Sequence, residues 1–186
     1  MFPITRNRKL LFNIQKYNKK VRLGKKKVET GLPSKKVMLS LNLPKFEVKT
    51  INKDGKTTIF DVIRRRYVAL TPEEWVRQHF VHFLLEHKGY PKTLMANEVQ
   101  IRLNGTTKRC DTVLYRRDLT ARMIVEYKAP DIEITQEVFN QITRYNMVLK
   151  VDYLIVSNGM QHYCCRMDYA NNSCRFLNDI PDYNVL

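Results

Sequence analysis

Three charged residues interrupt two apolar segments in the middle of the sequence. Asp111 precedes Val113-Leu114-Tyr115, while Glu126 and Lys128 follow Met123-Ile124-Val125. Each apolar run has the length of a strand, and a polar turn of hairpin length separates them. Residues two apart leave the same face of a strand, and a charge among apolar neighbours must be paired or bound to a metal. This spacing indicates a site for a divalent cation and an anionic substrate, or alternatively a structural ion pair at a sheet edge.

A helix is predicted to precede these strands. Thr71 is placed as its N-cap, Pro72 takes the first helical position, and Glu74 three residues after Thr71 completes a capping box. Gly89 ends the helix after His87. Its expected core-facing residues are Trp75, Val76, Phe80, Phe83 and Leu84.

A strand over residues 94–103 follows, and Asn104-Gly105 predicts a hairpin into the strand of Asp111. Alternation places Val99, Ile101 and Leu103 on one face and Glu98 on the polar face. Glu98 is therefore a candidate third acid, and a solvated strand charge is the alternative interpretation.

A second helix is expected from the cap residue Thr135 to about Leu149, with Gln141 and Tyr145 one turn apart. Its apolar face comprises Val138, Phe139, Ile142 and Tyr145/Asn146. Strands over residues 152–157 and 161–168 follow. The predicted fold is α+β, with an αβββαβ order and a mixed sheet, because the second helix returns the chain to the sheet.

The positive charge of the chain is concentrated at its beginning. The net charge is +15, yet residues 1–37 hold 12 Lys/Arg and a single acid. We expect these residues to form a solvated basic leader in which Lys25, Lys26 and Lys27 could hold nucleic acid phosphates through charge. A leader without a specific role is an equal alternative. Residues 38–69 are expected to form a strand and hairpin extension, residues 70–178 the main domain, and residues 179–186 a tail.

Several classes of protein are disfavoured by the sequence. No apolar run approaches the ~20 residues of a membrane span, and the beginning lacks a secretory signal. The four cysteines show no metal-ligand spacing, so we expect reduced thiols and a cytoplasmic location. No G-x-x-x-x-G-K-[ST] loop is present, and no ATP site is expected.

At residues 70–165 the sequence resembles the N-terminal nuclease domain of type I restriction enzyme R subunits, a branch of the PD-(D/E)xK nuclease superfamily marked by Q-x-x-x-Y. The matching segments are Thr71-Pro-Glu-Glu-Trp-Val-Arg77, Gly89-Tyr-Pro91, Asn97-Glu98, Lys108-Arg-Cys-Asp111, Val125-Glu-Tyr-Lys-Ala-Pro130, Gln141-Ile-Thr-Arg-Tyr145 and Ser157-Asn-Gly159. The resemblance implies a restriction-endonuclease-like fold and a DNA endonuclease that hydrolyses phosphodiester bonds.

The resemblance also implies roles for individual residues. Asp111, Glu126 and Lys128 would be catalytic, with Mg²⁺, or Mn²⁺ as a substitute, held by both acids and by Glu98 as the third candidate ligand. Lys128 would orient or deprotonate the attacking water, or stabilise the developing charge. Supporting residues would be Gln141 and Tyr145, which contact DNA or orient Lys128, while Lys108 and Arg109 would meet the phosphate backbone.

The sequence departs from such R subunits because it has no helicase-like motor lobes. We therefore expect a stand-alone protein or a severed module, whose partners are DNA and either other restriction-system subunits or a separate motor protein, and whose activity could depend on a partner. Two alternatives remain: a catalytically silent nucleic-acid-binding or assembly module that keeps the fold, and a basic RNA-binding protein, which rests on the leader alone.

Overall fold

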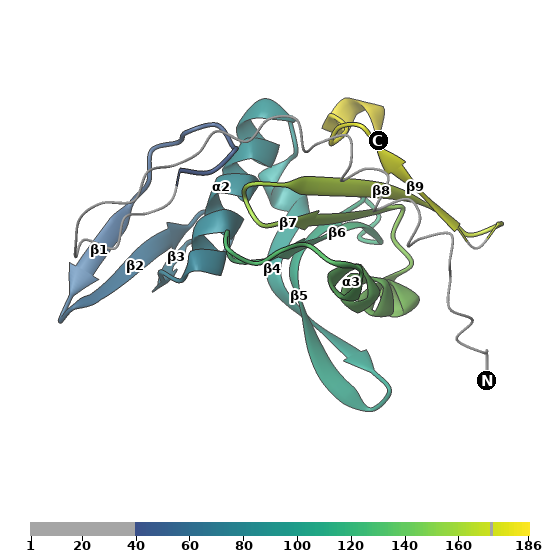
Figure 1. Ribbon diagram of the computed structural model, residues 1–186, viewed down its shortest axis with the longest axis horizontal. Helices are drawn as coiled ribbons and strands as arrows, with labels where there is room; N and C mark the ends of the chain where they lie inside the picture. The colour runs from purple at the N-terminus through teal and green to yellow at the C-terminus, as the bar shows by residue number, and fades with distance from the viewer. Residues whose placement is uncertain (1–39, 172) are drawn as a thin grey trace. The chain divides into compact units, whose positions relative to one another are not determined.

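A computed structural model describes residues 40–171 and 173–186, in which two β-sheets are accompanied by two α-helices (Figure 1). The predictions for residues 1–37, including Lys25, Lys26 and Lys27, lie outside the described residues. No helix in the described ranges is both long enough and apolar enough to cross a membrane.

The first sheet has three antiparallel strands in the order β1-β2-β3, with β1 at Thr50–Lys53, β2 at Lys56–Asp61 and β3 at Arg66–Ala69. Asp54 and Gly55 join β1 to β2 with φ values of 51° and 72°, the backbone that a tight hairpin requires. The predicted hairpin is confirmed. Its first strand begins at Thr50, and β3 is an additional strand within this extension.

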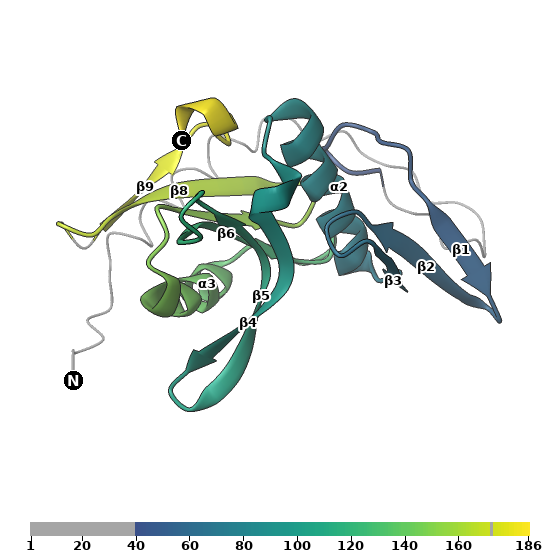
Figure 2. The same ribbon diagram turned by 180° about the vertical axis from the view of Figure 1, so that it is seen from behind.

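The second sheet has six strands in the order β4-β5-β6-β7-β8-β9 (Figure 2). Strands β4 to β6 form an antiparallel meander, β7 runs parallel to β6, and β8 and β9 are antiparallel again. The bounds are β4 Met95–Leu103, β5 Thr106–Tyr115, β6 Ala121–Tyr127, β7 Tyr153–Ser157, β8 His162–Asp168 and β9 Ser173–Leu177. The mixed sheet and the αβββαβ order are confirmed, and β9 is an additional strand.

Helix α2 spans Pro72–His87 and begins as predicted, because the Thr71 hydroxyl accepts a hydrogen bond from the Glu74 amide at 3.0 Å. The reciprocal half of the capping box is wrong. The Thr71 amide donates to the Ala69 carbonyl, while the Glu74 carboxylate accepts hydrogen bonds from Arg77 and Gln78. Gly89 follows the helix with a φ of 69°, which supports the predicted end.

The core-facing side of α2 differs in part from the prediction. Val76, Phe80 and Leu84 are fully buried as expected, and Phe80 packs against the Tyr127 ring of β6. Trp75 is only half-buried, with its ring 4.0 Å from that of His79. Phe83, also predicted to be buried, is half-buried, while Val81 is fully buried.

Helix α3 spans Gln136–Leu149. It covers the face of the six-stranded sheet opposite to the face against which α2 packs. Its buried side matches the prediction, with Phe139 packed against the rings of Tyr163 and Phe176 from β8 and β9. Successive strand residues point to opposite faces, so Tyr127 reaches the α2 side whereas Glu126 faces the α3 side. Both helices can therefore supply side chains near the end of β6.

Short turns complete the described chain. A 3-10 turn, η2, at Lys92–Leu94 precedes β4, and another, η3, at Tyr183–Val185 lies close to the end of the sequence. The segment after β9 folds back onto the end of α2, since the Lys88 ammonium lies 2.9 Å from an Asp179 oxygen and the Tyr183 amide donates to the Lys88 carbonyl.

Candidate active site

The two candidate acids lie side by side on β5 and β6. Thr112 pairs with Val125, which brings the adjacent residues Asp111 and Glu126 opposite each other on one face of the sheet. Both side chains are buried, with relative exposures of 9% for Asp111 and 3% for Glu126. Lys128 follows the end of β6, and its amide donates to the Ser157 carbonyl of β7. The neighbouring parallel strand therefore fixes the backbone of the lysine.

Helix α3 brings both of its predicted supporting residues to Glu126. Gln141 Nε2 and Lys128 Nζ each donate a 2.8 Å hydrogen bond to the same oxygen, Glu126 Oε1. Gln141 also donates to the Tyr145 hydroxyl at 3.2 Å. Because Gln141 and Tyr145 lie one turn apart on α3, their side chains form a chain of polar contacts that holds Glu126 and Lys128 in place.

Asp111 is held from the opposite side by a residue that the sequence did not single out. Arg77 of α2 places Nη2 2.8 Å from Asp111 Oδ1, while the other Asp111 oxygen accepts from the Tyr127 amide at 2.8 Å. Arg77 Nη1 lies 2.6 Å from Glu98 and 2.8 Å from Glu74. A signal was present, because Arg77 lies three residues after Glu74 within a segment that the resemblance had already marked.

Burial and mutual repulsion oppose ionisation of the acids at this site. Burial, together with the charge of Asp111, raises the pKa of Glu126 to about 7. Burial also raises the pKa of Asp111, against the opposing effect of Arg77. The pKa of Glu73, another acid that the sequence did not single out, is raised by burial and then by Asp111. These carboxylates lie where a further positive charge would be stabilised.

Lys128 shows the opposite balance. Burial alone would lower its pKa, but the hydrogen bond from its ammonium to Glu126 and the negative charges of Glu126, Glu73 and Asp111 raise it above the ordinary value. The side chain is therefore a cation at neutral pH, and its charge is directed toward the carboxylates.

The donor set formed by Asp111 and Glu126 suits a hard divalent cation. Within the described ranges, no three acidic, histidine or cysteine side chains are gathered closely enough to hold a metal ion by themselves. Mg²⁺ often uses one or two protein carboxylates and keeps several waters, so a pair of adjacent carboxylates is compatible with it. Both oxygens of Glu98, the predicted third ligand, instead lie in ion pairs, one with Arg77 and one with Arg109.

The predicted phosphate-contacting residues lie on the hairpin formed by β4 and β5, which extends away from the rest of the six-stranded sheet (Figure 1). Lys108 is exposed, and the side chain of Arg109 is 60% exposed although it pairs with Glu98. Arg65 and Arg66 are exposed as well, whereas Arg64 is engaged by Asp61 and Glu74.

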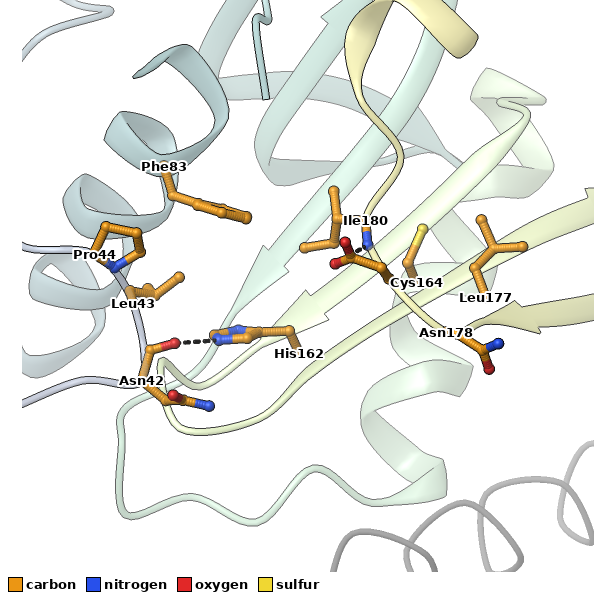
Figure 3. Close-up of a pocket in the computed structure, with 10 residues that line it drawn as sticks. Asn42, Leu43, Pro44, Phe83, His162, Cys164, Leu177, Asn178 and Ile180 are labelled. Atoms are coloured by element: carbon orange, nitrogen blue, oxygen red, sulfur yellow. Dashed lines mark hydrogen bonds between the residues drawn. The ribbon is translucent and has the colours of Figure 1, made fainter. Parts of the chain in front are cut away.

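A small pocket of about 180 Å³ lies apart from this constellation (Figure 3). It is lined by Asn42, Phe83, His162 and Cys164 among others, and none of the candidate catalytic residues contributes to its wall. His162 Nε2 donates to the Asn42 carbonyl at 3.0 Å, and the Ser157 hydroxyl donates to His162 Nδ1 at 2.8 Å. The histidine is thus satisfied as a structural bridge between the segment before β1 and the β7–β8 turn.

Comparisons with solved structures return distant relatives. One is the fragment structure of a protein assigned as an HsdR subunit of a type I restriction enzyme from Vibrio vulnificus YJ016, with 20% identity and a TM-score of 0.45 over 60% of this chain and 24% of that chain. Another is a cryo-EM structure of a DrdV–DNA complex, with 18% identity and a TM-score of 0.39 over 59% of this chain and 11% of that chain. This chain therefore spans about a quarter or less of each of these proteins. None of the curated proteins matches it.

A family profile covers most of the described chain. The family described as "Type I restriction enzyme R protein N terminus (HSDR_N)" matches residues 72–181, from the first helical residue of α2 to just beyond β9. The matched region includes every predicted site residue of the described part and Arg77. The chain therefore belongs to the family of type I restriction enzyme R protein N-terminal domains.

Proposed function

We propose that this chain is a divalent-metal-dependent endonuclease of the PD-(D/E)xK type that hydrolyses phosphodiester bonds in DNA. The observation that carries the proposal is the convergence of Asp111 on β5 with Glu126 and Lys128 at the end of the adjacent β6, with Gln141 of α3 bonded to Glu126. A Glu-x-Lys pair beside an aspartate is suited to a substrate that is itself an anion and gains charge during reaction.

In this proposal Asp111 and Glu126 would hold the Mg²⁺ ion, for which Mn²⁺ could substitute. The ion would polarise the phosphate and make a bound water more acidic. The carboxylates would orient the water shell next to the scissile phosphate, while Gln141 keeps the Glu126 carboxylate in a fixed rotamer. Glu98 would not be required for this arrangement, because ion pairs engage both of its oxygens.

Lys128 is best suited to stabilise negative charge. A raised pKa makes its ammonium a poor base at neutral pH and a permanent hydrogen-bond donor. Of the three roles open to it from the sequence, charge stabilisation and orientation of the water are therefore favoured over deprotonation. The exposed Lys108 and Arg109 would add charge contacts to the DNA backbone, which predicts salt-sensitive binding.

The experiment is nicking of supercoiled plasmid by the full chain in Mg²⁺ and in Mn²⁺, with Asp111→Asn, Lys128→Met and, as a matched control, the exposed Lys92→Met. We expect Asp111→Asn and Lys128→Met each to lower the nicking rate by about a hundredfold or more, because both groups would act on the transition state. Nicking by both variants at the rate of Lys92→Met would refute the site.

A catalytically silent DNA-binding module is the second candidate. It is favoured by one observation, the engagement of Asp111 and Glu98 by Arg77 in the described structure. Salt-sensitive DNA binding by the wild type without nicking in either metal, alone or with the motor and specificity subunits of a restriction system, would select it. Those subunits are the partners that we propose for this chain.

A further inference from the structure

Arg77 places a buried positive charge among three carboxylates of the site. Its side chain is 5% exposed, and its two terminal nitrogens contact carboxylates from three elements, Glu74 on α2, Glu98 on β4 and Asp111 on β5. The guanidinium also lies 5.7 Å from the centre of the Tyr127 ring. A buried arginine is retained at low cost only when several charges or hydrogen bonds compensate its loss of water.

Arg77 and the three acids around it stabilise each other's charges. Burial would lower the pKa of Arg77, but the charges of Asp111, Glu74 and Glu98 outweigh burial and raise that pKa. The side chain of Glu98 contacts the guanidinium, while its backbone has a φ of 61°. Residues other than glycine rarely adopt this φ within a strand. Such a conformation persists where surrounding contacts compensate its cost, and the two ion pairs of Glu98 supply those contacts.

Asp111 therefore lies between two groups of side chains, one around Glu126 and the other around Arg77. On one side, Glu126 is bonded to Lys128 and Gln141 through a single oxygen. On the other side, the Arg77 guanidinium fills the space between Asp111 Oδ1 and Glu98 Oε1, at 2.8 Å and 2.6 Å. A divalent cation bridging those two oxygens would have to displace a buried arginine.

We propose that Arg77 is a fixed counter-cation that takes the place of a second divalent ion, so that the site binds one metal ion at Asp111 and Glu126 and Glu98 serves Arg77 rather than the metal. This inference rests on the proposed function. Arg77 is then a positioning residue, which acts on the chemistry through Asp111 and Glu98.

The test is the number and affinity of Mn²⁺ ions bound by the full chain, measured by calorimetry and by electron paramagnetic resonance of bound Mn²⁺. We expect one ion in the wild type and in Arg77→Lys, which keeps the charge. Arg77→Met removes the positive charge that Asp111, Glu74 and Glu98 share, and we expect it to bind a second Mn²⁺ that is magnetically coupled to the first. Arg109→Met is the matched control, because it removes a Glu98 partner without opening space beside Asp111, and it should bind one ion.

Glu98→Gln keeps the inference testable if Arg77→Met fails to fold. We expect it to lower Mn²⁺ affinity by less than about tenfold, whereas Asp111→Asn and Glu126→Gln lower it much further. Two ions in the wild type, or a loss in Glu98→Gln as large as that in Asp111→Asn, would overturn the inference and leave the proposed function standing. Absence of any bound Mn²⁺ in the wild type would overturn both.

Discussion

The buried carboxyl of Glu126 should make the metal-free protein lose stability as pH rises. Its side chain is almost fully buried, and its pKa is raised from 4.5 to about 7, mainly by burial and then by Asp111. The folded state therefore holds this proton more tightly than the unfolded chain does. The resulting stabilisation is fully present below about pH 4.5 and is lost as pH rises through about 7.

The size of the effect follows from the same values. A pKa that is higher by this amount in the folded state corresponds to about 3 kcal/mol of unfolding free energy, as an upper bound. For a chain of this length, that is a decrease in melting temperature of about 10 °C. Because Asp111 and Glu126 repel each other, the titration belongs to the pair, and Asp111→Asn should also reduce the decrease.

The assay is thermal unfolding in the presence of a chelator, followed by circular dichroism between about pH 5.5 and about pH 8. Glu126→Gln keeps an oxygen that can accept from Lys128 and Gln141, and its melting temperature should change little over this range. The exposed Glu133→Gln serves as the control and should follow the wild type. Parallel curves for wild type and Glu126→Gln would refute the reasoning, because the charged carboxylate would then cost nothing in the folded state.

Two further predictions concern the packing of the domain. Phe80→Ala removes a fully buried ring and should cost about 3–5 kcal/mol in urea unfolding, whereas Trp75→Ala, half-buried on the same helix, should cost about 1–2 kcal/mol; equal losses would contradict the observed orientation of α2. Gly159→Ala adds a methyl group 2.8 Å from Leu41 Cδ2 at a φ of 80°, whereas Gly105→Ala adds one at a φ of 73° with no atom within 4 Å. In urea unfolding, the loss of stability at Gly159 should therefore exceed the loss of about 1 kcal/mol expected at Gly105. A smaller loss at Gly159 would show that the Leu41 side chain moves away at little cost.

Local signals explain why the core of the fold could be predicted. Asn104 and Gly105 have φ values of 49° and 73°, so the dipeptide forms the tight turn that its residue types favour. Thr71 caps α2 through its hydroxyl, and the buried side of α3 follows from its apolar periodicity. In each case, neighbouring residues along the chain determine the structure.

The parts that were missed depend on contacts between distant segments. The four-residue strand β3 exists because Thr58 to Asp61 of β2 pair with it, and its own sequence has little alternation. Trp75 was placed in the core by its spacing, but α2 is rotated so that Val81 takes a buried position. The position of Asp111 beside Glu126 could be predicted from a hairpin, whereas its pairing with Arg77 joins residues 34 positions apart. Periodicity carries no information on that contact.

The unusual backbone of Glu98 also bears on how the molecule meets other copies of itself. Strand β4 forms one edge of the six-stranded sheet, where amide and carbonyl groups on the outer side have no strand partner within the described sheet. An edge of nine residues would offer a template for intermolecular strand pairing. At Glu98 the chain leaves the extended conformation in the middle of that edge, and a second strand cannot continue its hydrogen-bond ladder past this point. The conformation that delivers a carboxylate to Arg77 therefore also interrupts the edge with which another strand would pair.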